Sequence, residues 1–406
     1  MKLPTSRPSR LLLVAAANLV LAFLLLEIGL RVQEPFLHLM SRHDQNSPNH
    51  RFAVIDHPIW DHQLRPGLRD VWLHLGERGG GAGHRYLLRT NAWGCRYGEI
   101  RVPRPADRYR VLVLGDSFTE GYAEEDTVSR HLERALAASG APIRFEVMNC
   151  GVSSYSLVSI LLRLRDQLLA AEPDAVIVNV DLTDPYDDYW RRRPDLRLDA
   201  AGRPLAVGSL EAEGPLRDFA ERHSYAVRAV SAYSRLAEKL AKLALRRALH
   251  PEEDLESAPP LDTLSDRYRM HGPGPAAAQE FEAAWVFFAE QLDRLIELCR
   301  AANLACAFSS YPHEAQLARD GEPPALRREL QARLAAHLAA RGIYFHDAHA
   351  AIAAAYARDP AIYRSGDMHF SPAGQRVWGR DFAGAFAPWV LAGAAGSAAP
   401  HQQMPE

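Results

Sequence analysis

The segment from residue 109 to residue 138 constrains the fold of this chain more than any other. Residues 109–114 form a short apolar run rich in Val and Leu, which is typical of a buried parallel strand. The run ends at Gly115, and residues 115–121 read Gly-Asp-Ser-Phe-Thr-Glu-Gly. Residues 127–138 then show helical periodicity. The sequence therefore predicts a strand, a tight turn and a helix, with Ser117 at the strand's carboxyl end, where open α/β sheets place their functional residues.

The same alternation of strand and helix continues along the chain and indicates βαβ units in a parallel sheet. Further strands are predicted at 144–149, 175–180, 304–309 and 343–346, and further helices at 157–171, 216–249, 277–302 and 325–340. A last helix is expected to begin near Pro372 and to be interrupted at Pro388. We expect an α/β fold of the flavodoxin-like kind, with three layers and helices on both faces of the sheet.

Ser117 and a distant Asp-x-His pair have the residue types that nucleophilic catalysis needs. The turn would hold the Ser117 hydroxyl clear of the sheet and leave its backbone N–H to face a developing oxyanion. Asp367 lies two residues before His369, in a loop of Ser, Pro and Gly. Its carboxylate can accept a hydrogen bond from the imidazole and leave the other nitrogen to take the serine proton. The alternative for Ser117 is a plain turn serine, and Asp116 is expected to bond turn amides.

The order of these motifs resembles the SGNH/GDSL hydrolase family, whose nucleophile lies in a Gly-Asp-Ser motif and whose Asp and His share one late loop. The resemblance covers about residues 107–391, which is most of the chain. It implies an SGNH hydrolase-like three-layer fold and a serine esterase. In that esterase Ser117 would be the nucleophile, His369 the general base and Asp367 the residue that orients His369. It implies no metal and no organic cofactor.

The resemblance also implies a site for the oxyanion, and here the sequence departs from the family. The Ser117 and Gly151 N–H groups are two expected donors, although Gly151 could be a plain turn glycine. The family's third block expects Gly-x-Asn-Asp after a strand, but this chain has Asp-Leu-Thr-Asp at 181–184. Thr183 stands where the Asn belongs, and its hydroxyl is a single donor on a shorter arm. Thr183 or a water molecule would have to substitute. Asn179, which lies nearby, ranks below Thr183 as a donor.

Candidate substrate-binding residues follow two of the predicted strands. Asp184 and Tyr186 open a segment of acids and aromatics that suits stacking on a sugar ring, although the same residues could pack beneath an insertion. His313 follows the 304–309 strand and is expected to contact substrate. The histidines at 346–349 match no strong metal-ligand spacing, so no metal site is expected. No phosphate-binding glycine loop or basic patch appears, so no nucleic-acid partner is expected.

The amino-terminal segment predicts a membrane helix. Residues 11–30 are apolar except for Glu27, and twenty helical residues span about 30 Å, the thickness of a hydrocarbon core. Lys2, Arg7 and Arg10 precede the run, which favours a cytoplasmic amino terminus and a catalytic domain outside the cytoplasm. We therefore expect a single-pass protein of the inner membrane with a periplasmic domain. A cleaved signal peptide is the alternative, but no convincing small-x-small cleavage site directly follows the run.

The expected organisation has five parts. They are a short cytoplasmic segment at 1–10, the anchor at 11–30, a linker or strap at 31–105, the catalytic domain at 106–391 and a disordered tail at 392–406. Insertions near 191–214 and 250–278 could form a lid over the site or loops without a role. Four cysteines (Cys95, Cys150, Cys299 and Cys306) are expected to be buried thiols, with one disulfide possible outside the cytoplasm.

Composition bounds the function. A hydrophobic content of 48% is enough for a sizeable core, and a net charge of −3 argues against a nucleic-acid partner. The expected activity is hydrolysis of O-acyl esters, such as O-acetyl groups, on a small-molecule, polysaccharide or lipid substrate outside the cytoplasm. One alternative is an acyltransferase that uses the same triad on an envelope polysaccharide. Another is an envelope-binding protein with a degraded site. The sequence leaves the oligomeric state open.

Overall fold

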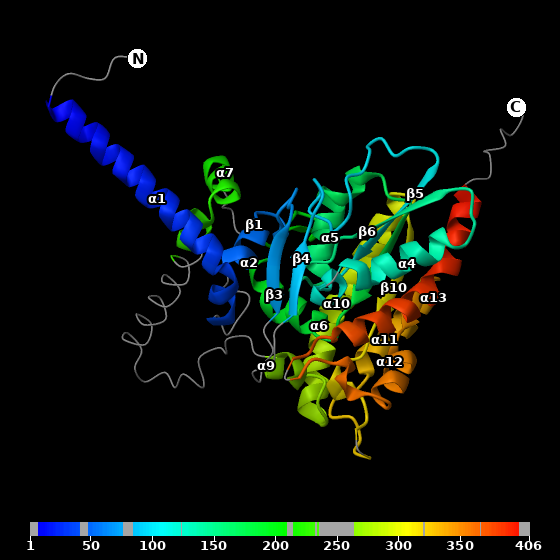
Figure 1. Cartoon of the computed structure of the whole chain (residues 1–406). Coiled ribbons are helices and arrows are strands. Elements are labelled where there is room, and N and C mark those ends of the chain that lie inside the picture. The colour runs from blue at the N-terminus through cyan, green and yellow to red at the C-terminus, as the bar shows by residue number, and fades with distance from the viewer. Residues whose placement is uncertain are drawn as a thin grey trace, which may run out of the picture.

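The predicted parallel sheet is present in the computed structural model (Figure 1). The structure describes residues 7–40, 48–75, 84–122, 124–208, 214–231, 234, 264–319, 321–365 and 367–397. The central sheet has five strands in the order β11-β10-β7-β5-β6, and every neighbouring pair is parallel. The strands are β5 (Arg108–Leu114), β6 (Arg144–Asn149), β7 (Ala175–Val180), β10 (Ala305–Ser310) and β11 (Tyr344–Asp347). The α/β fold expected from the alternating pattern is therefore confirmed.

Helices cover both faces of this sheet, because the side chains of each strand alternate between two apolar cores. On β5, Val111 and Val113 face one core, whereas Leu112 and Leu114 face the other. The first core is completed by α4 (Val128–Ala137), α12 (His349–Tyr356) and α13 (Pro372–Ser397). The second core is completed by α5 (Leu157–Asp166), α10 (Pro275–Ala301) and α11 (Glu329–Ala339). The result is a three-layer arrangement whose strands all end at one edge.

The segment before the sheet is part of the second core and not a loose linker. It forms α2 (Pro48–Ala53) and two antiparallel hairpins, β1 (Val54–His57) with β2 (Asp61–Leu64) and β3 (Val71–Leu75) with β4 (His84–Leu88). Phe52, Trp60, Leu64 and Tyr86 are buried in that core. The hairpins therefore stabilise the same fold that carries the sheet.

A disulfide attaches this segment to the sheet. Cys95 and Cys150 are bonded, and Cys150 directly follows β6. Cys299 and Cys306 are free, and Cys299 is buried. The expectation of four buried thiols is therefore wrong for the first pair, because contact between residues this far apart in sequence depends on how the hairpins pack.

The end of the chain also differs from expectation. The single helix α13 runs from Pro372 to Ser397, through Pro388, so the predicted interruption is absent. Residues 392–397, predicted to be disordered, are helical, while 398–406 lie outside the described residues. Val390 and Ala394 are buried in the first core. Burial of these side chains outweighs the loss of one backbone hydrogen bond at proline.

The two expected insertions are only partly described. Near 191–214 the chain forms a π-helix (Asp187–Arg192) after the short α6 (Asp184–Tyr186), and then a small hairpin of β8 (Arg197–Leu198) and β9 (Pro204–Ala206). The helix predicted at 216–249 ends early as α7 (Pro215–His223), and 225–231 form a second helical segment. Residues 235–263 lie outside the described residues, and α9 (Leu264–Arg269) follows them.

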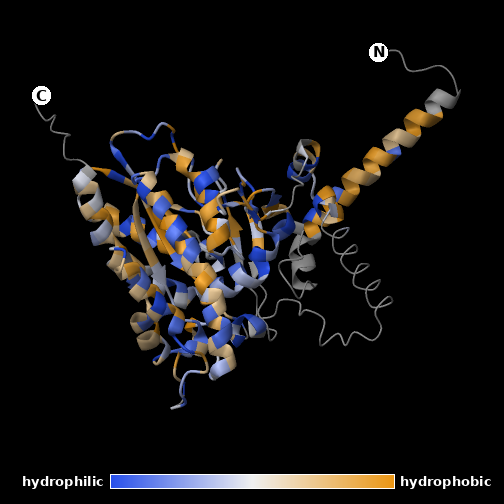
Figure 2. Ribbon diagram, turned by 180° about the vertical axis from the view of Figure 1, so that it is seen from behind, coloured by the Kyte–Doolittle hydropathy of each residue, from blue (hydrophilic) through white to orange (hydrophobic). Residues whose placement is uncertain are grey.

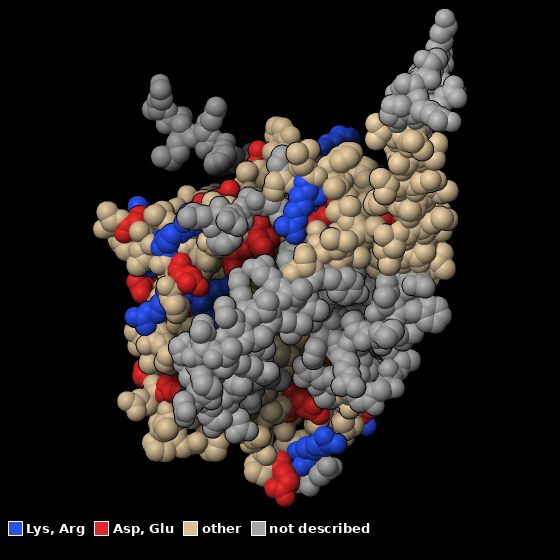
Figure 3. Space-filling view, turned by 90° about the vertical axis from the view of Figure 1, so that its left-hand side faces the viewer, with Lys and Arg blue, Asp and Glu red and all other residues tan. Residues whose placement is uncertain are grey.

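Helix α1 (Arg7–Met40) extends away from the folded body (Figure 1). Its segment Leu11–Val32 is long and apolar enough to cross a membrane, and none of it is buried inside the protein. Figure 2 shows α1 as a largely orange, hydrophobic rod, and in Figure 3 it rises at the upper right as a column with few charged side chains. Length and composition suit either a membrane anchor or a signal sequence.

Candidate active site

The turn after β5 presents Ser117 at the start of a short helix. Asp116 caps α3 (Ser117–Glu120), and its Oδ1 accepts a hydrogen bond from the Phe118 N–H at 3.0 Å. Gly115 leaves no room for a side chain, since a Cβ there would lie 2.2 Å from Thr119 Oγ1. The Ser117 N–H meets no acceptor among the described residues. The turn therefore exposes both a hydroxyl and a free backbone donor, as the sequence predicts.

Ser117, His369 and Asp367 lie in hydrogen-bond contact. The Ser117 Oγ is 2.7 Å from His369 Nε2, and His369 Nδ1 is 2.6 Å from Asp367 Oδ1. The pair Ser117 and His369 is brought together across 252 positions of sequence. Ser117 is partly exposed, so a substrate can reach its hydroxyl. This is the arrangement in which an imidazole can take the serine proton.

The guanidinium of Arg364 holds the carboxylate of Asp367 in place. Arg364 Nη1 donates to Asp367 Oδ2 at 2.8 Å, and the Arg364 N–H donates to the His369 carbonyl oxygen at 3.0 Å. Burial opposes ionisation of Asp367, but the hydrogen bond and charge of His369, together with the charge of Arg364, hold its pKa below the usual range. Asp367 therefore stays an anion that accepts from the imidazole. Sequence reasoning missed Arg364, because a lone Arg three residues before an Asp carries no catalytic signal.

Aromatic rings fix the orientation of the histidine. The ring of Phe118, next to the candidate nucleophile, is tilted against the His369 ring with centroids 4.8 Å apart. Tyr122 meets the same ring edge-on at 6.0 Å. The imidazole is therefore held on the serine by packing as well as by hydrogen bonds.

The structure does not leave the Gly151 N–H free as an oxyanion donor. This N–H donates to Asn149 Oδ1 at 3.1 Å. A Cβ at Gly151 would lie 2.5 Å from the Glu120 backbone nitrogen, so the glycine is required for close packing on α3. The neighbouring Val152 N–H donates to the Gly115 carbonyl oxygen at 3.1 Å. This hydrogen bond joins the loop after β6 to the turn that carries Ser117. The predicted role of Gly151 as an oxyanion donor therefore stays a prediction, and it would require this N–H to leave Asn149.

Ser154, later in the same loop, has the features that were expected of Gly151. Its φ of 64° lies in the left-handed region, which few residues other than glycine adopt. Its N–H has no acceptor in the described part of the chain. The preceding Ser153 is fixed through its N–H and Oγ, which both donate to Glu120 Oε2 at 2.8 Å. The sequence did not single out Ser154, because serine is not a signal for a left-handed backbone.

Thr183 is also not free to bind an oxyanion through its hydroxyl. Its hydroxyl and its backbone N–H both donate to Asp181 Oδ1 at 2.7 Å. Burial of Asp181 opposes ionisation, but His313 and Thr183 outweigh it and hold the pKa of Asp181 below its usual range. The Thr183 hydroxyl therefore has its one hydrogen occupied, and the expectation that it faces the oxyanion is not met. Asn179 is buried and donates from Nδ2 to Thr119 Oγ1 at 2.9 Å.

Two of the three predicted substrate-binding residues are buried. His313 is fully buried, with Nε2 2.6 Å from Asp181 Oδ2 and Nδ1 2.6 Å from the Tyr268 hydroxyl. Asp184 is buried, its Oδ2 accepts the Asp181 N–H at 3.0 Å, and burial with the charge of Asp181 raises its pKa. Neither side chain reaches a substrate in this structure, because both complete a polar network beneath the strand ends. Tyr186 is partly exposed and packs against the second core.

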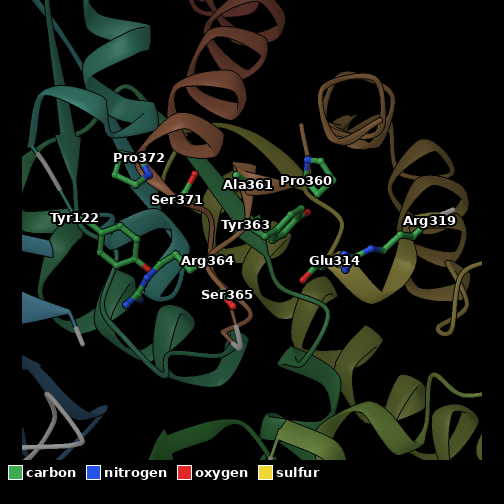
Figure 4. A pocket seen from close by; sticks show the side chains of 10 residues that line it. All are labelled: Tyr122, Glu314, Arg319, Pro360, Ala361, Tyr363, Arg364, Ser365, Ser371 and Pro372. Carbon is green, nitrogen blue, oxygen red and sulfur yellow. Dashed lines mark hydrogen bonds and ion pairs between the residues drawn. The ribbon is translucent and has the colours of Figure 1, made fainter. Parts of the chain in front are cut away.

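A cavity of about 380 Å³ is lined by Arg364, which bonds Asp367, and by Ser371, which follows the His369 loop (Figure 4). In Figure 4, Tyr122 and Arg364 stand on one side and Glu314 and Arg319 on the other, with Ser365 between them. Neither Ser117 nor His369 lines it. Among the described residues, no group of three or more His, Cys, Asp or Glu lies close enough together to hold a metal ion.

Comparison with known proteins places this site in a family. The model of the GDSL-like lipase/acylhydrolase family matches residues 113–377, which carry both the Ser117 turn and the His369 loop. No curated protein matches the chain significantly.

Solved structures similar to the chain include the lipase/acylhydrolase from Enterococcus faecalis, with 14% identity, a TM-score of 0.38 and coverage of 69% of this chain and 96% of that one. They also include a catalytic mutant of an acetylxylan esterase from Geobacillus stearothermophilus, with 13% identity, a TM-score of 0.36 and coverage of 68% and 92%. These likenesses are distant. Because the family model covers more than half of its length, the chain belongs to the GDSL-like lipase/acylhydrolase family.

Proposed function

We propose that this protein is a serine esterase that hydrolyses O-acyl esters outside the cytoplasm. The observation that carries the proposal is the continuous hydrogen-bonded row from Ser117 through His369 to Asp367, with distances of 2.7 and 2.6 Å. A partly exposed serine bonded to an imidazole whose other nitrogen is held by a carboxylate has the geometry of an activated nucleophile.

The reaction would proceed through an acyl-enzyme. His369 Nε2 takes the proton as Ser117 Oγ attacks the ester carbonyl carbon, and the ionised Asp367 stabilises the imidazolium that forms. When the tetrahedral intermediate collapses, the C–O bond to the alcohol breaks and Nε2 returns the proton to the leaving oxygen. Water then gives its proton to Nε2 and attacks the acyl carbon. The bond between that carbon and Ser117 Oγ breaks, Nε2 returns the proton to Oγ, and the acid leaves.

The oxyanion would be held by backbone donors. The Ser117 and Ser154 N–H groups both lack acceptors in the described part of the chain, and they lie on the two loops that the Val152-to-Gly115 hydrogen bond joins. Thr183 gives its hydroxyl hydrogen to Asp181 and supplies no third donor in this conformation. Loss of one such donor costs roughly 10²–10³ in rate in other enzymes, so slow turnover is expected.

We further propose that α1 anchors the catalytic domain to the outer side of the inner membrane. The basic residues Lys2, Arg7 and Arg10 before the apolar run support this orientation. The Cys95–Cys150 disulfide supports an oxidising compartment. Glu27 of α1 is hydrogen-bonded to the backbone of residues 225 and 226, which supports a helix that is retained in the mature protein.

The substrate we propose is an O-acyl, and in particular an O-acetyl, ester of an envelope carbohydrate or lipid. Two features support it: the anchor, which would confine the enzyme to the envelope, and the polar and aromatic lining of the cavity next to Arg364, with Tyr122, Ser365 and Ser371. Such a lining offers hydroxyl groups and ring faces to a sugar.

Turnover of a short-chain aryl acetate by the full-length protein in detergent tests the proposed function. Ser117→Ala should lower kcat by at least about 10³-fold, because the bond-forming oxygen is removed. Ser139→Ala is the matched control, since the Ser139 hydroxyl bonds only within its own turn: it donates to the Leu136 carbonyl oxygen and accepts from the Ala141 N–H. Equal activity in wild type and Ser117→Ala would contradict the proposal. Adding an acetylated donor with an oligosaccharide acceptor separates hydrolysis from acyl transfer, because transfer yields an acylated sugar in place of free acid.

A further inference from the structure

Three large apolar side chains are exposed beside α1. Leu216 and Phe219 of α7 are 86% and 62% exposed, and they lie three residues apart, on one face of the helix. Val230, in the helical segment that follows, is 67% exposed. Exposure of large apolar side chains to water is unfavourable, and a group of them on a protein surface commonly marks a contact with a partner or a membrane.

The segment that carries them is fixed to the membrane-helix candidate. The Glu27 carboxylate accepts hydrogen bonds from the Ser224 hydroxyl at 2.9 Å, the Tyr225 N–H at 2.7 Å and the Ala226 N–H at 2.8 Å. Arg31 donates to the same carboxylate at 2.7 Å. Glu27 therefore caps the 225–231 helical segment and attaches it to α1, and Figure 1 shows the two lying side by side.

The same segment is fixed to the folded body on its other side. Glu221 of α7 forms an ion pair with Arg65 at 2.8 Å, and both side chains are buried. Arg228 lies over the Phe52 ring at 3.7 Å from its centroid, and Arg222 donates to the Pro66 carbonyl oxygen at 3.0 Å. Residues 215–231 are thus held between α1 and the hairpins that precede the sheet.

If Leu11–Val32 spans a bilayer, the attachment at Glu27 lies at the depth of the membrane interface. Glu27 precedes Val32, the end of the candidate span, by five residues. At a rise of 1.5 Å per residue this places Glu27 about 7.5 Å inside the end of the span. Helices that lie in the plane of a bilayer bury their apolar face about 5–10 Å deep, at the boundary of headgroups and acyl chains. The exposed parts of Arg31 and Arg217 would then meet lipid headgroups.

We propose that residues 215–231 are a second membrane contact, which lies in the interface beside α1 and places Leu216, Phe219 and Val230 among the acyl chains. The occupant of this surface is the lipid bilayer, because the surface continues directly from the apolar span of α1 through the Glu27 hydrogen bonds. The inference rests on the proposal that α1 spans the membrane. Its consequence is that the catalytic body is held against the bilayer in one orientation instead of hanging from a flexible tether.

Photo-crosslinking tests this contact without any need for enzyme activity. The photoreactive residue p-benzoylphenylalanine replaces Phe219 in the full-length protein, which is reconstituted in vesicles of phosphatidylethanolamine and phosphatidylglycerol, irradiated and analysed by mass spectrometry for lipid adducts. The matched control replaces Val286 of α10, which is also apolar and 65% exposed. Replacement of Leu25, within the span, reports separately on α1.

The proposal predicts lipid adducts at 219 and at 25, with at least tenfold fewer at 286. Adducts at 25 but only the level of 286 at 219 would overturn the second contact and leave the anchor intact. Crosslinks from 219 to a second copy of the protein, in place of lipid, would also overturn it. Absence of adducts at both 219 and 25 would overturn the anchor and, with it, this inference. Replacement of Leu216 gives an independent position, so a folding defect of one variant does not decide the result.

Discussion

At the scale of single residues, the Arg364 guanidinium is the group beyond the triad whose role is easiest to measure. It donates to Asp367 Oδ2 and stays nearly buried while doing so. Removing it leaves the triad carboxylate with one partner fewer, and hydrogen bonds to charged groups contribute about 1.5–3 kcal/mol. Arg364→Ala should therefore lower kcat by roughly 10- to 100-fold with little change in KM, and Arg364→Lys should restore part of it. Steady-state kinetics on an aryl acetate checks this.

The control for that measurement is Arg376→Ala, which removes an exposed Arg–carboxylate pair with Asp126 instead. A positioning role for Arg364 requires that Arg364→Ala remains as stable as wild type at the assay temperature. An unchanged kcat in Arg364→Ala would contradict the positioning role. So would a fall in kcat that matches the loss of folded protein and is not reversed in Arg364→Lys, because Arg364 would then have a structural role alone.

The contacts of residues in short motifs were predictable, and the contacts of residues whose partners lie far away in the sequence were not. The Ser117 turn and the Asp367–His369 spacing each define local chemistry, so the sequence predicted their contact. Thr183 and His313 were expected to face substrate, but both bond to the buried Asp181 carboxylate. The sequence does not show that Asp181, at the end of a strand, is buried, or that its carboxylate binds the side chains of Thr183 and His313.

At the scale of elements, a buried carboxyl group links the loop after β7 to α5. Asp188 Oδ1 accepts the Val158 N–H at 3.1 Å, and burial raises the pKa of Asp188 to about 7. An unfolded Asp titrates near 3.9, so the folded state binds this proton more tightly. The group therefore costs stability increasingly as pH rises from about 4 to about 7, and the cost is constant above that range.

Asp188→Asn should remove this pH dependence while keeping an oxygen that can accept from Val158. The free energy of unfolding of the variant minus that of wild type should therefore be about 2 kcal/mol larger at pH 8 than at pH 5, which means that the variant gains relative stability at the higher pH. Urea unfolding of both proteins at the two pH values measures the difference. A stability change of the same size at pH 5 and pH 8 would show that Asp188 does not titrate in this range.

The Cys95–Cys150 disulfide is the covalent link between the hairpin segment and β6. It closes a loop with a sequence separation of 55 residues. The chain-entropy model gives a contribution of about 4 kcal/mol for a loop of this length, and measured values are commonly lower, about 2–4 kcal/mol. The double variant Cys95→Ser/Cys150→Ser should therefore unfold at clearly lower urea concentration, as should the wild type under reducing conditions. Cys306→Ser, which removes a free thiol, should unfold close to wild type. Unaltered stability of the double variant would show that the bond does not constrain the unfolded chain.

The main strands were predictable because each is a short apolar run before a turn, and each observed strand overlaps its prediction. The course of α13 past Pro388 was not, because local propensity opposes it and only burial of Val390 and Ala394 in the first core favours it. The short hairpins β1–β2 and β3–β4 also gave no clear pattern, since their apolar side chains are buried in the second core together with residues far away in the sequence.

At the scale of the whole molecule, α1 and the segment 215–231 decide where the catalytic body works. If α1 is a retained anchor, the protein should stay in the membrane pellet after alkaline carbonate extraction, and its amino-terminal peptide should still contain residues 1–10. Release of intact protein into the supernatant would contradict the anchor. Loss of the first residues up to the end of the span would instead show that a signal peptide is removed. The sequence predicted the apolar span, but not that Glu27 within it caps a helix nearly 200 residues later in the chain.

The central claim is that Ser117 is a nucleophile activated by His369, and a fluorophosphonate probe tests it most directly. The full-length protein in detergent is incubated with the probe, and the labelled peptide is identified by mass spectrometry for wild type, Ser117→Ala, His369→Ala and the control Ser139→Ala. The account predicts a single modified serine at position 117, no label in Ser117→Ala and at least about 10²-fold slower labelling in His369→Ala, because the general base is lost. A folded wild-type protein that is not labelled at Ser117, or that is labelled equally fast without His369, would contradict it.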